Sequence, residues 1–166
     1  MEVIFGNQTI ELKGNEKNIG DQVNDFTVMN NDLQPVKLSD FKDSPYLLIS
    51  VVPSLDTGVC DYQTKTVNKA LNDIDNLKVI TISNDLPFAQ KRWCGNEGME
   101  NVLTLSDYKD LSFAHEFGTL LEPVRLQARA IFVLDPDRKV IYREIVENVS
   151  NHPAYDALIK FIEGLK

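Results

Sequence analysis

A cysteine that could act as a nucleophile, Cys60, ends the segment Pro53–Cys60. The preceding apolar run, Tyr46–Val52, predicts a buried strand, and the spacing of apolar residues after Cys60 predicts a helix. With Thr57 as the helix N-cap, the thiol lies in the first turn, where unpaired N–H groups and the helix dipole favour a thiolate. Free cysteines are also among the most buried residue types, so position alone leaves a reactive thiol and a core residue equally open.

A second thiol, Cys94, lies in the segment Ser83–Gly95, and the chain has two cysteines in all. Two cysteines are too few for a disulfide scaffold. In a reducing compartment a permanent disulfide is unusual, and a transient catalytic disulfide is the common exception. The pair is therefore a candidate for redox chemistry.

The residues around both cysteines resemble a known family. Pro53, Thr57 and Cys60 form the pattern Pro-x-x-x-Thr-x-x-Cys, which resembles the active-site signature of peroxiredoxins. The longer string Ser50–Cys60 is similar to that of one branch, the bacterial thiol peroxidases. Ser83–Gly95 is similar to the segment of that branch that carries its resolving cysteine. Separate motifs in the right order make the resemblance specific.

A third stretch, Ala128–Asp135, is similar to the strand that carries the family's active-site arginine, here Arg129. The resemblance extends nearly end to end and includes an amino-terminal hairpin. It implies a thioredoxin-like fold and a thiol-dependent peroxidase that reduces hydrogen peroxide and organic hydroperoxides. It also implies thioredoxin as the electron donor and a homodimer.

The resemblance implies a role for each of five residues. Cys60 attacks the peroxide and becomes a sulfenic acid, with which Cys94 condenses to form an intramolecular disulfide. Thr57 and Arg129 hydrogen-bond the reacting oxygens, while Pro53 shapes the pocket and shields the thiolate. Because the two cysteines lie on different predicted helices, we expect one or both helices to unwind partly before the disulfide closes.

Each supporting residue also has a purely structural interpretation. Thr57 can simply cap the helix, and Pro53 can simply end the strand. An arginine at the end of an apolar strand, such as Arg129, usually points to solvent.

The same residues could belong to three other kinds of protein. A thioredoxin-type disulfide oxidoreductase needs Cys-x-x-Cys, but Thr57 stands three residues before Cys60. A zinc site lacks the spacing of any ligand pair among its candidates, which are Cys60, Cys94, His115 and His152. A thioredoxin-like redox sensor or binding module without turnover remains the alternative, and a sensor would react with peroxide only once.

Length and net charge limit the number of domains and the kinds of molecule that the protein is expected to bind. The 166 residues favour one domain, 1–166, and the net charge of −8 argues against binding nucleic acid or an anionic membrane.

The segment Met1–Asn7 lacks the features of a secretory signal, and no apolar run is long enough to span a membrane, which predicts a cytoplasmic location. Without a glycine-rich dinucleotide or phosphate motif, no flavin, nicotinamide or other cofactor is expected, nor is a metal, so the reductant must be external.

The remaining pattern predicts an α/β fold with a central mixed β-sheet flanked by helices and preceded by an N-terminal β-hairpin. Strands are expected at residues 2–5, 8–12, 26–29, 36–38, 46–52, 77–83, 102–105, 129–134 and 139–146. Helices are expected at 39–41, 58–72, 87–94, 111–117 and from 153 onward, and residues 119–126 are expected to form a loop.

Overall fold

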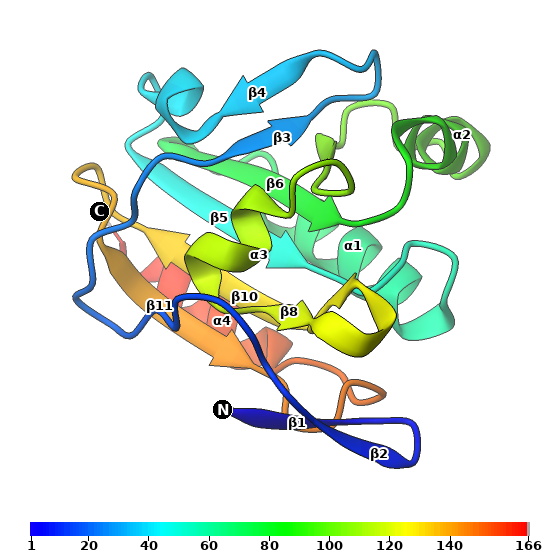
Figure 1. Ribbon diagram of the computed structural model, residues 1–166. Coiled ribbons are helices and arrows are strands. Elements are labelled where there is room, and N and C mark those ends of the chain that lie inside the picture. The colour runs from blue at the N-terminus through cyan, green and yellow to red at the C-terminus, as the bar shows by residue number, and fades with distance from the viewer. Residues whose placement is uncertain (166) are drawn as a thin grey trace.

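The computed structural model describes residues 1–165, in which a twisted sheet carries helices on both faces (Figure 1). Its strands are β1 (Glu2–Phe5), β2 (Gln8–Glu11), β3 (Thr27–Met29), β4 (Pro35–Lys37), β5 (Tyr46–Val51), β6 (Leu77–Ser83), β7 (Thr104–Ser106), β8 (Leu120–Leu121), β9 (Leu126–Gln127), β10 (Ala130–Leu134) and β11 (Val140–Ile145). Its α-helices are α1 (Gly58–Leu71), α2 (Pro87–Asn96), α3 (Ser112–Phe117) and α4 (Tyr155–Glu163), and its 3-10 helices are η1 (Leu38–Phe41) and η2 (Glu122–Val124).

The central sheet has the strand order β11-β10-β5-β6-β7-β3-β4. The three middle strands, β5, β6 and β7, are parallel, and every other pairing is antiparallel. Parallel neighbours require crossover connections, which α1 and α2 supply. The predicted mixed sheet flanked by helices is therefore confirmed.

Two cores lie on the two faces of the sheet because successive side chains in a strand point in opposite directions. In β5, Leu47, Ile49 and Val51 belong to the cluster that includes the phenylalanines of α3. Leu48 points the other way and packs with apolar residues of α1 and α4. The continuous apolar run of β5 is thus explained by a strand buried on both faces.

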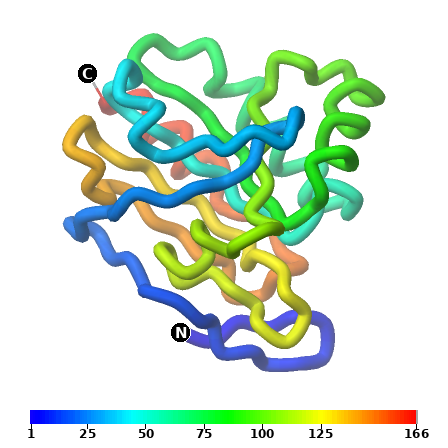
Figure 2. Tube along the Cα trace, turned by 45° about the horizontal axis from the view of Figure 1, so that its top comes forward, coloured from blue at the N-terminus to red at the C-terminus, as the bar shows by residue number. Residues whose placement is uncertain are grey.

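The amino-terminal hairpin of β1 and β2 is confirmed, and Gly6 in its turn has the positive φ of 61° that such a turn requires. The hairpin lies at the opposite end of the molecule from β3 and β4, as Figures 1 and 2 both show. It is fastened to the chain after β11, since the Ile4 amide donates to Glu147 at 2.7 Å and the Val149 amide donates to Ile4 at 2.9 Å.

Several sequence-based boundaries differ from the structure by one or two residues, including the start of α4 at Tyr155 instead of 153, and three further differences have a local cause. The expected loop at 119–126 contains β8, η2 and β9, whose two-residue strands are too short for a periodic pattern to reveal. The strand expected at 102–105 is Thr104–Ser106, because the preceding turn extends to Val102. Helix α2 continues beyond Cys94 to Asn96, since Gly95 keeps the helical conformation.

One buried carboxylate holds the start of α3. Asp107 is 2% exposed and accepts hydrogen bonds from the amides of Phe113 and Ala114, both at 2.9 Å. Gln127 Nε2 donates to the same carboxylate at 2.8 Å. Burial nevertheless dominates and raises the pKa of Asp107 from 3.8 to about 6.

A stability prediction follows from this raised pKa. The native state binds more protons than the unfolded state between the two values, so the contribution of Asp107 is full below about pH 4 and is lost as the pH rises through about 6. In the parent, Asp107 is expected to make the free energy of unfolding fall by about 3 kcal/mol across this window. Asp107→Asn should abolish that fall, because an asparagine does not titrate. Urea unfolding at a series of pH values measures it, with exposed Asp110→Asn as control. Parallel curves for Asp107→Asn and the parent would contradict this assignment.

Candidate active site

Cys60 occupies the first turn of α1, as predicted, and its side chain is completely buried. Thr57 is the N-cap residue, but its side chain makes no capping hydrogen bond. Instead Thr57 Oγ1 donates to the carbonyl of Ser54 at 3.2 Å. The prediction that Thr57 is the N-cap residue is therefore confirmed, although its hydroxyl does not make the capping bond, and the hydroxyl oxygen keeps lone pairs with which to accept a further hydrogen bond.

Arg129 meets Cys60 because β10 runs antiparallel to β5. The pairing of Ala130 with Val51 puts the start of β10 beside the end of β5, where the chain turns toward α1. Arg129 Nη2 lies 3.3 Å from Cys60 Sγ. The arginine is only 2% exposed, so the expectation that a strand-end arginine points to solvent does not apply here. A permanent cation with forked N–H donors therefore lies beside the sulfur.

The other two nitrogens of the Arg129 guanidinium also donate hydrogen bonds. Nε donates to the carbonyl of Val149 at 2.7 Å, and Nη1 donates to Gln63 Oε1 at 3.0 Å. Gln63 is completely buried and in turn donates to Ser50 Oγ at 2.9 Å. Three fixed acceptors thus hold the guanidinium in one orientation.

Gln63 was missed by the sequence analysis. The signal available was its position three residues after Cys60, which puts both side chains on the same face of a helix. A second signal was Ser50, a hydroxyl in an otherwise apolar strand. Neither signal identifies Arg129 as the partner of Gln63, because these two residues are far apart in the sequence.

The loop before α1 is held by Asp85. Its carboxylate accepts hydrogen bonds from Ser54 Oγ at 2.7 Å and the Leu55 amide at 2.8 Å. Ser83 Oγ, at the end of β6, donates to the same carboxylate at 2.7 Å. The segment that leads into Cys60 is therefore fixed to the end of the neighbouring strand.

A cavity of about 340 Å³ is lined by Arg129 and by Gly58 and Val59 of the first turn of α1, while Cys60 itself is buried and contacts the cavity only through Arg129. Three of the predicted site residues, Pro53, Thr57 and Arg129, lie in its wall. Its remaining lining residues are Phe5, Gly6, Gly58, Val59, Val149 and Ser150. Larger hollows of about 460 and 520 Å³ lie elsewhere on the surface, but none of the predicted site residues lines either of them.

Cys94 does not line this cavity. It is 5% exposed and lies with Cys60 in one buried cluster that includes Val52, Leu55 and Trp93. The two cysteines are not bonded to each other. Burial raises the pKa of the Cys94 thiol, and a hydrogen-bond contact with Thr104 Oγ1 at 3.5 Å opposes that effect. Cys94 is therefore a protonated thiol at neutral pH while α2 is intact.

The structure brings Pro53, Thr57 and Arg129 together in one cavity wall. Cys60 contacts Arg129 from the buried cluster that it shares with Cys94. Within residues 1–165, no three side chains of histidine, cysteine, aspartate or glutamate converge in a way that could hold a metal ion. In the same part of the chain, no helix has the length and apolarity needed to cross a bilayer.

Fold and site together define a thioredoxin-like redox protein in which a buried thiol contacts a buried arginine. The Redoxin family model matches residues 18–159. A thiol peroxidase from Staphylococcus aureus (strain MRSA252) is 51% identical over 158 residues, which make up 95% of both chains. This chain therefore belongs to the Redoxin family and, within it, to the thiol peroxidases, which are peroxiredoxins.

Two further comparisons support the same family assignment. A thiol peroxidase from Listeria innocua is 46% identical over 159 residues, or 96% of each chain. The crystal structure of a peroxiredoxin-like protein from Aquifex aeolicus has a TM-score of 0.88 at 30% identity and covers 98% of this chain and 95% of its own. The family resemblance inferred from three motifs and the thioredoxin-like fold are both confirmed.

Proposed function

We propose that the chain reduces hydrogen peroxide and organic hydroperoxides with Cys60 as the attacking group and Cys94 as the resolving thiol. Thiol-dependent peroxidase activity follows from membership in the family. In the first step the Cys60 thiolate attacks the terminal oxygen of ROOH, the O–O bond breaks and RO⁻ leaves. RO⁻ takes up a proton to become ROH, and Cys60 is left as a sulfenic acid.

The observation that carries the proposal is the 3.3 Å contact between Arg129 Nη2 and Cys60 Sγ at the edge of a cavity. A guanidinium here can stabilise the thiolate before attack and donate to the departing oxygen as negative charge develops on it. Because its orientation is already fixed by Val149 and Gln63, no reorganisation is needed during the reaction.

Thr57 and Pro53 complete the proposed pocket. The Thr57 hydroxyl hydrogen points to Ser54, which leaves its oxygen to accept the O–H of the bound peroxide. Pro53 is buried, has no N–H and lies in the cavity wall, where it excludes water from the thiolate. Together with Arg129 they orient the O–O bond toward the sulfur.

Cys94 then resolves the oxidised site. Its sulfur attacks Cys60–SOH, a disulfide forms and water leaves, so that both thiols and one peroxide have been consumed. Since both cysteines are buried within helices, local unwinding of α1, α2 or both must precede this step. Thioredoxin is the proposed reductant, which returns both cysteines to thiols by disulfide exchange.

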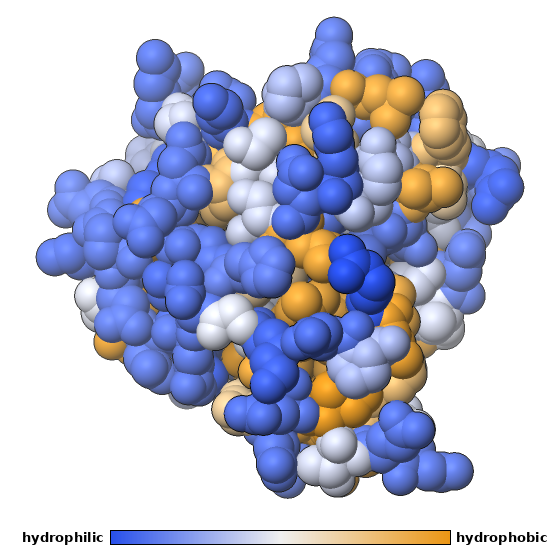
Figure 3. Space-filling view, viewed as in Figure 1, coloured by the Kyte–Doolittle hydropathy of each residue, from blue (hydrophilic) through white to orange (hydrophobic). Residues whose placement is uncertain are grey.

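Assembly and location belong to the same proposal. We place the enzyme in the cytoplasm, where thiols are kept reduced. A homodimer is supported by the exposed apolar residues at the start of α2, where Leu86 and Phe88 are 52% and 65% exposed. Apolar side chains also gather on the surface over this helix in Figure 3.

The proposal is tested by adding one equivalent of peroxide to the reduced protein. Free thiols should fall from two to none, with a loss of two hydrogen atoms in intact mass and no covalent dimer. Repeated turnover in the presence of thioredoxin and its reductase separates an enzyme from a sensor that reacts once. A single oxidation without turnover would favour the sensor, and an intermolecular disulfide would overturn the assignment of Cys94.

Substrate preference gives a separate prediction at the hairpin. The Phe5 ring and Val59 make part of the cavity wall apolar, which favours the organic portion of a hydroperoxide. Phe5→Ala is expected to lower kcat/KM for cumene hydroperoxide by about tenfold and leave hydrogen peroxide reduction unchanged, because only the larger substrate reaches the ring. The neighbouring Ile4→Ala, whose side chain is outside the cavity wall, is the matched control. An equal loss on both substrates would mean that Phe5 acts through the fold.

A further inference from the structure

Four side chains connect the helix that carries Cys60 to the helix that carries Cys94. Trp93 Nε1 donates to Asp61 Oδ1 at 2.9 Å. Lys65 Nζ lies 2.9 Å from Asp61 Oδ2 and 2.7 Å from Glu97 Oε2. Asp61 and Lys65 belong to α1, whereas Trp93 is in α2 and Glu97 is its C-cap residue. We refer to Asp61, Lys65, Trp93 and Glu97 as the α1–α2 bridge.

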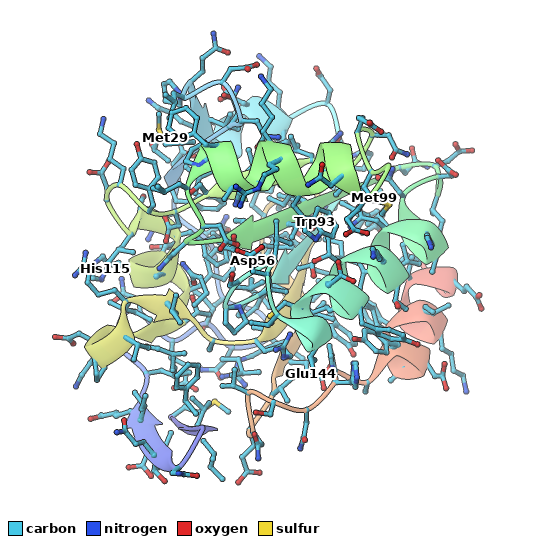
Figure 4. The ribbon with its side chains drawn as sticks, turned by 90° about the vertical axis from the view of Figure 1, so that its right-hand side faces the viewer. Met29, Asp56, Trp93, Met99, His115 and Glu144 are labelled. Atoms are coloured by element: carbon cyan, nitrogen blue, oxygen red, sulfur yellow. The ribbon has the colours of Figure 1, made fainter. Side chains whose placement is uncertain are left out.

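The bridge is next to both sulfurs in the sequence and in space. Asp61 directly follows Cys60, and Trp93 directly precedes Cys94. Figure 4 shows Trp93 projecting from α2 into the space between that helix and α1. Both cysteines share a buried cluster with this tryptophan, so the bridge closes over the core in which the thiols are packed.

We propose that the α1–α2 bridge controls the resolving step: it keeps both cysteine helices folded during peroxide attack, and its opening limits the rate of disulfide formation. This inference rests on the proposed role of Cys94. The chemistry is the condensation already described, in which Cys94–SH and Cys60–SOH give a disulfide and one water. Asp61, Lys65, Trp93 and Glu97 are positioning residues, since none of them touches the peroxide.

The contacts of the α1–α2 bridge are exposed enough to break and re-form in every catalytic cycle. The side chains of Lys65, Asp61 and Glu97 are 29%, 30% and 38% exposed, so water can replace their partners as the helices separate. Trp93 is 7% exposed, so its partly buried hydrogen bond to Asp61 is the more costly one to break. The bridge therefore biases the folded arrangement without locking it.

Two reactions therefore compete for the Cys60 sulfenic acid, namely over-oxidation and disulfide formation. While the bridge is closed, Cys94 is buried as a thiol and a second peroxide can oxidise Cys60 to the sulfinic acid. Once the bridge opens, Cys94 becomes exposed and the disulfide forms. The stability of the bridge thus sets the fraction of enzyme that is over-oxidised at high peroxide concentration.

Lys65→Met tests the inference, because it removes both ion pairs and retains the aliphatic stem. Trp93 is the only tryptophan, so stopped-flow fluorescence can follow the two steps in the reduced full-length protein. We expect the rate constant for disulfide formation to rise about three- to tenfold, with the rate of peroxide attack unchanged. Over-oxidation by excess peroxide, read by intact mass, should fall by the same factor.

Two further variants make the test specific. Glu97→Gln removes one ion pair and should produce a smaller change in the same direction. Lys69→Met, at an exposed site one turn along α1, should leave both steps as in the parent. An unchanged or slower resolving step in Lys65→Met, or an equal change in Lys69→Met, would overturn the role of the bridge. If the parent forms no disulfide between Cys60 and Cys94, the proposed function fails instead, which is a distinguishable result.

Discussion

Replacement of Cys60 with serine is expected to abolish peroxide consumption, with a loss of about 10⁴-fold or more in kcat/KM. A serine hydroxyl does not ionise near neutral pH, so Arg129 would face a neutral oxygen that cannot attack the O–O bond. The isosteric side chain should fit the fully buried site, and the far-UV circular dichroism spectrum should be unchanged. Peroxide consumption coupled to thioredoxin turnover measures the loss.

The matched control is the same substitution at Cys94. Cys94→Ser should react once with peroxide at the parent rate, lose its single thiol and stall as a sulfenic acid that dimedone traps. Excess peroxide should then carry Cys60 to the sulfinic acid. Residual turnover in Cys60→Ser, or an inert Cys94→Ser, would exchange the proposed roles of the two cysteines.

The second large effect is expected at Arg129. Arg129→Lys keeps the positive charge but loses the planar fork that contacts Cys60, Gln63 and Val149 at the same time. A lysine can make at most part of this set and leaves Gln63 without its buried donor. We expect the rate constant for peroxide attack to fall by about 10²-fold, the usual cost of one pre-oriented donor to a developing oxyanion.

A transient-kinetic measurement of Cys60 oxidation isolates this step from recycling. Arg92→Lys, at an exposed position of α2, is the control for the chemical change alone. An Arg129→Lys variant that attacks peroxide as fast as the parent would show that charge alone suffices. A variant that loses helical content would be replaced by Gln63→Glu, which retains an acceptor for Arg129 in a side chain of similar size.

The elements of the fold were predictable where one local pattern was strong. The apolar run of β5, the β-branched run of β6 and the amphipathic α4 follow directly from their residue types. The short strands β8 and β9 were not predictable, because two residues cannot display a period. Their pairing depends on Leu120 and Gln127 meeting across a turn, which only the folded chain decides.

The residues of the candidate site likewise differ in how far they could be predicted from a local pattern. Pro53, Thr57 and Cys60 are local, so one short motif identified them together. Gln63 looked like an ordinary polar residue of an amphipathic helix, and its burial becomes intelligible only beside Arg129. The bond between Asp61 and Trp93 could not be predicted from a local pattern, because it joins two helices separated by β6.

The attachment of the hairpin has a practical consequence for protein production. Ile4 is hydrogen-bonded on both sides to the segment 147–149, and the carbonyl of Val149 accepts from Arg129 Nε. Truncation before β3, or a bulky amino-terminal affinity tag that pulls β1 away, would release the acceptor that orients the guanidinium. Recombinant preparations should therefore carry their purification handle at the carboxyl end, since β1 holds the segment 147–149, which in turn orients the arginine beside Cys60.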